Sequence, residues 1–143
     1  MGDGTKRKTV KLKISDRTIL DVRIGENEIL CGSHHASIED AIVHAEQHLG
    51  SYRKPMDPYF GTMRDNAGTV VGFKLSGTKR WRLDFDPDAS TNKGVHVNEE
   101  NYDAPGGEQK IVHVVVDNRS YLQVHHYYKR WSARYGISTT RND

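Results

Sequence analysis

Alternation of apolar and polar residues predicts strands along much of this chain, and the clearest example is the segment 80–86. Every second residue of this segment is apolar, from Trp81 to Phe85, and the residues between them are arginine and aspartate. A period of two is typical of a strand with one buried face. The charged face of this strand is therefore expected to point away from the core. The same period returns in residues 95–98 after a glycine-containing loop.

Similar alternation predicts strands at 10–14, 19–24, 29–30, 69–75 and 110–116. The last has the strongest pattern, with valines on one face and His113 on the other, between Ile111 and Val115. A Ser-Gly-Thr turn joins 69–75 to the 80–86 strand and predicts a hairpin. Segments rich in proline, glycine or charge are predicted to be loops: 51–66, 87–94 and 99–109.

Two segments have the 3.6-residue period of helices. The first begins after Ser37, which with Asp40 forms a capping box, and it ends at Gly50. The second contains a stripe of large residues spaced three and four apart, which indicates a core-facing helix side. Its members are Tyr121, Val124, Tyr128, Trp131 and Tyr135, with Asp117 or Asn118 as the expected cap.

These elements predict an α+β fold, an antiparallel β-sheet with one helix before and one helix after the central strands. The chain of 143 residues is expected to form a single domain over 1–143. Within it we expect an N-terminal strand region at 1–36, a core at 37–117 and a C-terminal helix at 118–136.

Composition narrows the function classes. The net charge of +2 gives no overall basic field that would indicate nucleic acid. Cys31 is the single cysteine, so no intramolecular disulfide and no multi-cysteine zinc site is expected. No segment has the roughly 20 apolar residues of a membrane span, and the start does not resemble a secretory signal. Export is therefore expected to depend on a larger parent protein or on a dedicated export machinery.

His96 and His113 are the strongest catalytic candidates, because each lies on a strand whose neighbouring residues are valines facing the other way. If the two strands are adjacent, the imidazoles are expected about 5 Å apart. Two imidazoles beside a cation suit a metal-independent ribonuclease, in which one is the base and the other the acid. Arg82 and Lys93 are the expected cations. The expected substrate contacts, with no metal and no cofactor, are Asn98, Arg80 and Asp84.

Two alternatives remain open at this point. His44 and His48 are spaced four apart on the first helix and, with a carboxylate such as Asp84, would suit a metal-dependent DNase. The non-functional interpretation is that both histidines lie on a solvated flank of the helix. The second alternative is a non-catalytic binding module of the immunity or adaptor type, whose charged sheet face docks a partner.

Residues 39–117 resemble the C-terminal toxin domains of bacterial polymorphic toxins, of the Rhs and contact-dependent-inhibition type. The similarity lies in a helix from Asp40-Ala41 to Leu49-Gly50, the Arg80–Asp86 strand, and the Lys93–Glu99 segment, which matches "G-P-H-[VI]-N-x-E" with valine in place of proline. The strand that contains His113 follows, as in that pattern.

This resemblance implies a small cytotoxic effector, commonly a nuclease that hydrolyses RNA. It implies delivery into the cytoplasm of a competing bacterium as part of a larger secreted protein, and a cognate immunity protein as partner. It implies a functional role for His96 and Asn98, which match the motif itself, and for His113, which lies on the strand that follows the motif. The oligomeric state is left open.

Overall fold

The computed structural model describes residues 7–50, 56–63, 66–116 and 121–138, and these form the α+β fold that the sequence predicts. Helix α1 (Ile38–Leu49) precedes the central strands and helix α2 (Tyr121–Ala133) follows them. The remaining elements are β1 (Arg7–Lys13), β2 (Ile19–Gly25), β3 (Glu28–Leu30), β4 (Asp57–Phe60), β5 (Val70–Lys74), β6 (Lys79–Phe85), the 3-10 helix η1 (Ala89–Thr91), β7 (Val95–Asn101) and β8 (Gln109–Val114).

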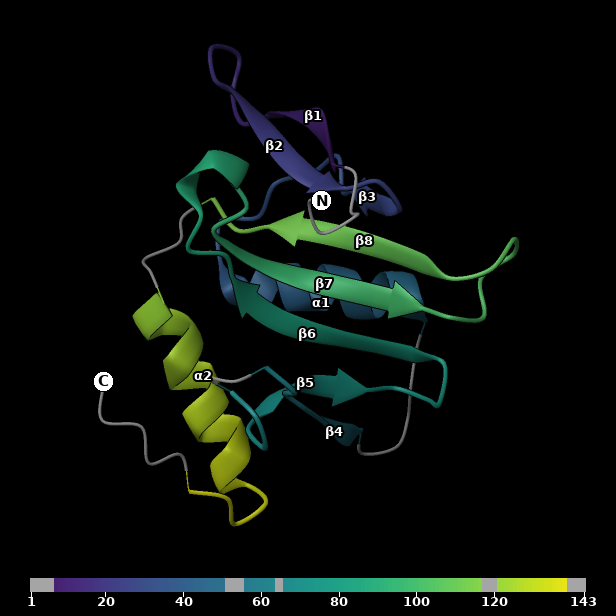
Figure 1. The fold of residues 1–143 in the computed structure, drawn as a ribbon, viewed down its shortest axis with the longest axis vertical. Helices are drawn as coiled ribbons and strands as arrows, with labels where there is room; N and C mark the ends of the chain where they lie inside the picture. Colours follow the sequence, from purple (N-terminus) through teal and green to yellow (C-terminus); the bar gives the residue numbers. More distant parts are fainter. Residues whose placement is uncertain (1–6, 51–55, 64–65, 117–120, 139–143) are drawn as a thin grey trace, which may run out of the picture.

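Six strands form one sheet in the order β3-β8-β7-β6-β5-β4, and β1 and β2 form a separate hairpin (Figure 1). Neighbours in the sheet are antiparallel except β3 and β8, which run parallel. β7 pairs with β6 on one side and with β8 on the other. The strands that carry His96 and His113 are therefore adjacent, as the predicted histidine pair requires. The pair also requires that both side chains point to the same face of the sheet.

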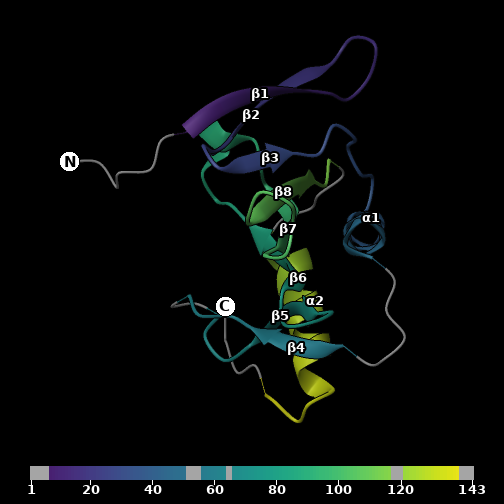
Figure 2. The same cartoon turned by 90° about the vertical axis from the view of Figure 1, so that its right-hand side faces the viewer.

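Helix α1 begins where the sequence predicts, because the Ser37 hydroxyl accepts a hydrogen bond from the Asp40 backbone N–H at 3.1 Å. Gly50 ends it with a φ of 118°, in the region that favours glycine. Figure 2 shows α1 beside one face of the sheet. Its buried residues pack there: Ile38, Ala41, Ala45 and Leu49.

The opposite face of the sheet is only partly covered. The β1–β2 hairpin packs on β8 through a small cluster of Leu12, Val22, Ile24, Val112 and Val114. Helix α2 lies at one end of β5 and β6, where its Trp131 joins the core on the α1 side and packs on Trp81 with ring centroids 5.5 Å apart (Figure 1). Neither helix is long and apolar enough to cross a membrane, judged on the described residues. The predicted α2 caps, Asp117 and Asn118, lie outside those residues.

Two segments predicted to be loops are partly strands. Residues 51–66 include β4, and this edge strand tolerates Pro58 because only one side of its backbone must pair. Residues 99–109 begin with the last part of β7. Glu99 and Glu100 are buried there, since each contacts a basic side chain of the sheet. The polar composition of these segments favours loops. Their strand pairing depends on neighbouring strands of the folded sheet, which the local sequence does not indicate.

Gly72 allows a close approach of β5 to β6. A Cβ at this position would lie 2.0 Å from the Trp81 carbonyl oxygen and 2.6 Å from the Cα of Arg82. We expect Gly72→Ala to lower the free energy of unfolding by about 3 kcal/mol, because one strand must move to relieve the overlap. Urea unfolding measures the change.

Gly77, in the turn of the same hairpin, is the matched control. A Cβ there meets nothing within 4 Å. Gly77→Ala is expected to change the free energy of unfolding by no more than about 0.5 kcal/mol. Equal urea midpoints for the two variants would contradict the steric argument.

Candidate functional site

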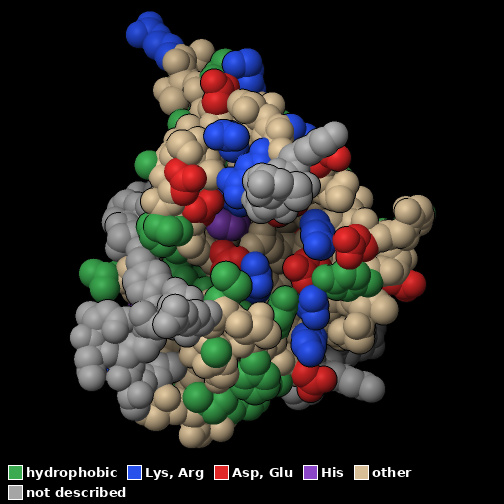
Figure 3. All heavy atoms as spheres, in the orientation of Figure 1, with side chains coloured by type: hydrophobic (Ala, Val, Ile, Leu, Met, Phe, Trp, Pro, Cys, Tyr) green, Lys and Arg blue, Asp and Glu red, His purple; other side chains and the backbone are tan. Residues whose placement is uncertain are grey.

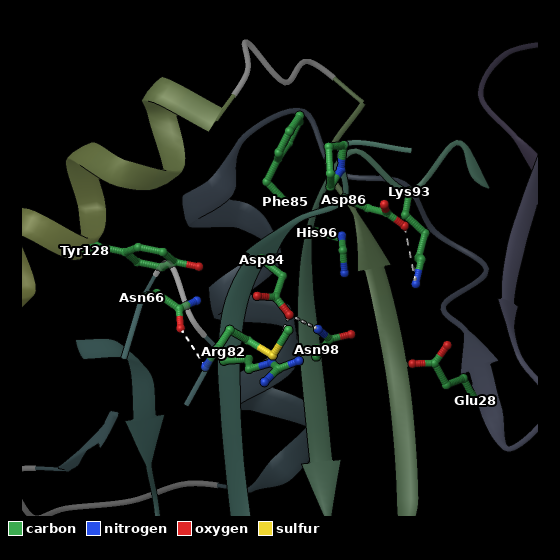
Figure 4. A pocket seen from close by; sticks show the side chains of 12 residues that line it. Glu28, Asn66, Arg82, Asp84, Phe85, Asp86, Lys93, His96, Asn98 and Tyr128 are labelled. Carbon is green, nitrogen blue, oxygen red and sulfur yellow. Dashed lines mark hydrogen bonds and ion pairs between the residues drawn. The ribbon is translucent and has the colours of Figure 1, made fainter. Parts of the chain in front are cut away.

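A pocket of about 600 Å³ lies on the partly covered face of the sheet. Its residues come from β6, β7, the loop between them and the flanking elements, among them Glu28 of β3 and Tyr128 of α2 (Figure 4). Figure 3 views this side of the molecule, where basic and acidic side chains surround a histidine near the centre. The pocket includes most of the predicted site: Arg82, Asp84, Lys93, His96 and Asn98.

The register of β6 and β7 brings these side chains to one face. Arg82 pairs with Asn98, and Asp84 pairs with His96. Directly opposed residues share a face, as do residues two apart on one strand. The alternation seen in the sequence is thereby confirmed, because Trp81, the residue before Arg82, points the other way and donates from Nε1 to a carboxylate of α1 at 2.9 Å.

The charged groups of the pocket are paired with one another. Asp84 Oδ2 accepts a hydrogen bond from Asn98 Nδ2 at 2.8 Å, and Arg82 Nε lies 2.9 Å from the same oxygen without the alignment of a hydrogen bond. Lys93 Nζ lies 3.8 Å from Asp86 Oδ2. Burial is the largest single influence on the Arg82 pKa and lowers it, but attraction to Asp84 together with smaller attractions to Tyr59, Glu100 and Tyr128 outweighs burial and raises the pKa. Arg82 is therefore a fixed, partly desolvated cation.

His96 lies at the bottom of the pocket and only 4% of its surface is exposed. Its Nδ1 is 2.8 Å from the Gly94 carbonyl oxygen, which can only accept, so Nδ1 carries the proton. Burial lowers the pKa of His96 and outweighs the opposing attraction of Asp84. The imidazole is therefore neutral at pH 7 with its lone pair on Nε2. Figure 4 shows the ring directed into the space between Asp84, Lys93 and Asn98.

The prediction that His113 joins His96 is wrong. β7 and β8 are adjacent, but His96 is opposite Val114, whereas His113 is opposite Val97. The two histidines therefore project from opposite faces of the sheet. His113 is buried on the α1 side, where its Nε2 lies 2.7 Å from Glu99 Oε1. It cannot supply a proton in the pocket.

Arg80 faces the same side as Arg82 but does not line the pocket. Its Nε donates to Glu100 Oε1 at 2.5 Å, and its guanidinium stacks on the ring of Tyr59 with 4.5 Å to the centroid. Tyr128, which the helical stripe assigns to the core, is buried and also lines the pocket, where its hydroxyl donates to the Leu83 carbonyl. The spacing of the stripe predicts that Tyr128 is buried, but it does not predict which group the Tyr128 hydroxyl contacts.

A second cluster of chemically active side chains lies on the α1 side of the sheet. One ligand atom from each of four residues lies within 4.8 Å of all the others: Cys31, His35, His44 and His113. The sequence patterns predict for His44 a place beside His48, either in a metal-dependent site or on a solvated helix flank, and they do not point to His35. The only sequence signal was a high density of histidines in residues 34–48. Among the described residues, no other group of three or more such ligands is this close.

The cluster perturbs the titration of its members. Burial, with repulsion from His113 and His44, lowers the pKa of His35 to about 4. Burial opposes protonation of His113, but Cys31 and Glu99 outweigh it and raise the pKa to about 9. The Cys31 pKa is lowered, since contact with His113 overcomes the effect of burial. As it stands, the cluster holds one positive charge between a polarised thiol and a buried carboxylate.

The hypothesised DNase site of His44, His48 and Asp84 is not formed. His44 belongs to the cluster and His48 Nδ1 contacts Glu99, so both lie on the α1 side. Asp84 pairs with His96 and faces the pocket on the other side.

Neither a protein-family model nor a curated protein matches this chain. The resemblance to polymorphic-toxin domains therefore rests on the motif residues, of which His96 and Asn98 meet in the pocket.

Proposed function

We propose that the chain is a metal-independent ribonuclease whose active site is the pocket of Arg82, Asp84, Lys93, His96 and Asn98. The observation that carries the proposal is the state of His96. Its Nδ1–H is held by the Gly94 carbonyl, so that the free lone pair of Nε2 is the group presented to the pocket. A neutral imidazole held in one orientation beside a guanidinium is suited to remove a proton from a hydroxyl next to a phosphate.

The proposed reaction is transesterification. His96 Nε2 takes the proton of the ribose 2′-OH, the 2′ oxygen forms a bond to phosphorus, and the bond from phosphorus to the 5′ oxygen breaks. The leaving 5′ oxygen takes a proton from water, and the proton on His96 then passes to the hydroxide that remains. Water therefore acts as the general acid, the role that the sequence predicted for one of the two histidines. The products are a 2′,3′-cyclic phosphate and a free 5′-OH.

Arg82 and Lys93 are proposed to hold the phosphate as negative charge develops on its oxygens. Both cations face acidic partners in the free protein, Arg82 with Asp84 and Lys93 with Asp86. Substrate phosphate would compete with these carboxylates. Asp84 also accepts from Asn98, so it orients two of the groups that are expected to meet the substrate. We assign it a positioning role.

The proposed reaction assigns no role to a metal in the pocket, whose carboxylates have protein partners in the free chain. Within the described residues, the one group of ligands that converges closely enough for an ion lies on the opposite face. The carboxylates Asp84 and Asp86 are instead committed to hydrogen bonds and cations of the pocket itself.

The resemblance to polymorphic-toxin domains supplies the biological part of the proposal. On that basis the chain is a cytotoxic effector that reaches the cytoplasm of a target bacterium within a larger protein, and a cognate immunity protein neutralises it. An inhibitor that covers the pocket face would block RNA and protect the producing cell.

Cleavage of RNA but not of DNA tests the proposed function. The purified chain is expected to degrade total bacterial RNA and a mixed-sequence RNA oligonucleotide, leaving 2′,3′-cyclic phosphate ends. The same oligonucleotide with 2′-deoxyribose throughout is expected to remain intact, because the attacking hydroxyl is missing. Cleavage of the deoxy substrate at a similar rate, or intact RNA together with harmless expression in bacteria, would overturn the proposal.

A further inference from the structure

The cluster of Cys31, His35, His44 and His113 has the dimensions of a zinc site. His44 Nδ1 lies 3.3 Å from His35 Nε2 and 3.7 Å from Cys31 Sγ. Tetrahedral zinc with ordinary bond lengths separates two nitrogen ligands by about 3.3 Å and a nitrogen from a sulfur by about 3.6 Å. Both separations measured from His44 therefore match those around a common ion, and all four donors lie within 4.8 Å of one another.

His113 supplies the fourth donor. Its Nδ1 is buried and has no hydrogen-bond partner, and it belongs to a side chain that is 2% exposed. The ring centroid of His113 lies 5.1 Å from that of His44 and 5.5 Å from that of His35. A buried nitrogen left unsatisfied is costly, and an ion at the centre of the cluster would satisfy it.

Glu99 provides the outer support that zinc-bound histidines usually have. Its Oε1 lies 2.7 Å from His113 Nε2, so the carboxylate accepts from this nitrogen and leaves Nδ1 to face the cluster. A carboxylate behind a ligand histidine fixes the ring orientation and strengthens the ligand. The same carboxylate also contacts His48 of α1.

We propose that Cys31, His35, His44 and His113 bind a zinc ion in a closed, four-coordinate structural site. One thiolate and three imidazoles form a set that zinc prefers, and four protein ligands leave no position for a substrate. The ion would join the segment after β3 and the helix α1 that follows it to strand β8, which is distant in sequence. It lies across the sheet from the pocket and would hold α1 on the sheet.

A metal-free network is the competing interpretation. Hydrogen bonds between neutral histidines and the thiol explain the separations of 3.3 and 3.7 Å. They do not explain the unpaired Nδ1 of His113. Cys31 and His44 are partly exposed, which gives an ion access to the cluster from solvent.

Metal content and cobalt substitution test the site. The chain should be expressed with added zinc, purified without a polyhistidine tag and dialysed against metal-free buffer, and about one zinc ion per chain is then expected. Cobalt(II) in place of zinc is expected to give the intense visible absorption of a four-coordinate site and a near-ultraviolet thiolate band. Because Cys31 is the single cysteine, this band can be assigned to it without ambiguity.

Variants separate a zinc site from a chance cluster. Cys31→Ser, which changes the shape least, is expected to lose the thiolate band and the bound zinc, and His44→Ala is expected to lose the zinc. His34→Ala removes a neighbouring histidine outside the cluster and is expected to keep both. Glu99→Gln is expected to weaken zinc binding about 10- to 100-fold.

Two results would overturn the proposal. One is folded wild-type protein that retains no zinc and gives the weak spectrum of six-coordinate cobalt. The other is zinc content in Cys31→Ser and His44→Ala equal to that of the wild type. The cobalt spectrum of the unmodified chain decides the matter even if a variant does not fold, and neither readout depends on RNA cleavage.

Discussion

Replacement of His96 by asparagine is expected to slow RNA cleavage by a factor of about 10² to 10⁴. The asparagine amide can still donate to the Gly94 carbonyl, as His96 Nδ1 does at 2.8 Å. It has no group equivalent to the Nε2 lone pair, so the base is lost while the local hydrogen bond is kept. The rate of cleavage of an RNA oligonucleotide, measured together with the thermal unfolding midpoint, checks the prediction.

His126→Ala is the control for this experiment, because His126 is an exposed histidine of α2 outside the pocket. The pH dependence of kcat/KM gives a further readout. The pKa of His96 lies below 6.5, so the base is neutral above that value and activity is expected to fall only at more acidic pH. A folded His96→Asn variant that cleaves RNA at the wild-type rate would remove His96 from the mechanism.

Replacement of Arg82 by alanine is expected to lower kcat by a factor of about 10² to 10³. Arg82 is a partly buried cation of the pocket, held 2.9 Å from Asp84, and no other arginine lines the pocket within the described residues. Arg82→Lys keeps the charge but not the planar guanidinium, and an intermediate rate is expected. Single-turnover cleavage measures the step directly.

Arg80→Ala is the matched control, since Arg80 is two residues away on the same strand and face. It is engaged by Glu100 and Tyr59 outside the pocket, so its loss should affect stability more than catalysis. If Arg80→Ala slows cleavage as much as Arg82→Ala, the effect reflects the charge of the sheet face and not a site.

The part of the pocket that lies on β6 and β7 was predictable from alternation alone. Arg82 and Asp84 had to share a face, as did His96 and Asn98, because side chains two apart on a strand point the same way. The Ser37 cap likewise predicted α1, and the apolar stripe predicted α2. These are local rules, and the residues concerned are close in sequence.

The pairing of His96 with His113 failed for a physical reason. Alternation orders residues within one strand, but the register between strands decides which faces match, and a shift of one residue reverses them. Val97 is opposite His113. The alternation predicted within each strand was therefore correct, but the expected contact between His96 and His113 was not. The cluster on the α1 side was harder still, since its ligands come from three elements and follow no spacing motif.

Strand β7 has a consequence for how inhibitors of this protein should be interpreted. It presents His96 to the pocket and, three residues later, Glu99 to the cluster behind the sheet. A chelator such as EDTA that removes the proposed zinc ion would loosen the support of the strand that positions His96, the proposed base. Loss of nuclease activity on chelation would then reflect a poorly held β7 and not the loss of a catalytic metal. Added zinc would restore the activity, whereas added magnesium would not.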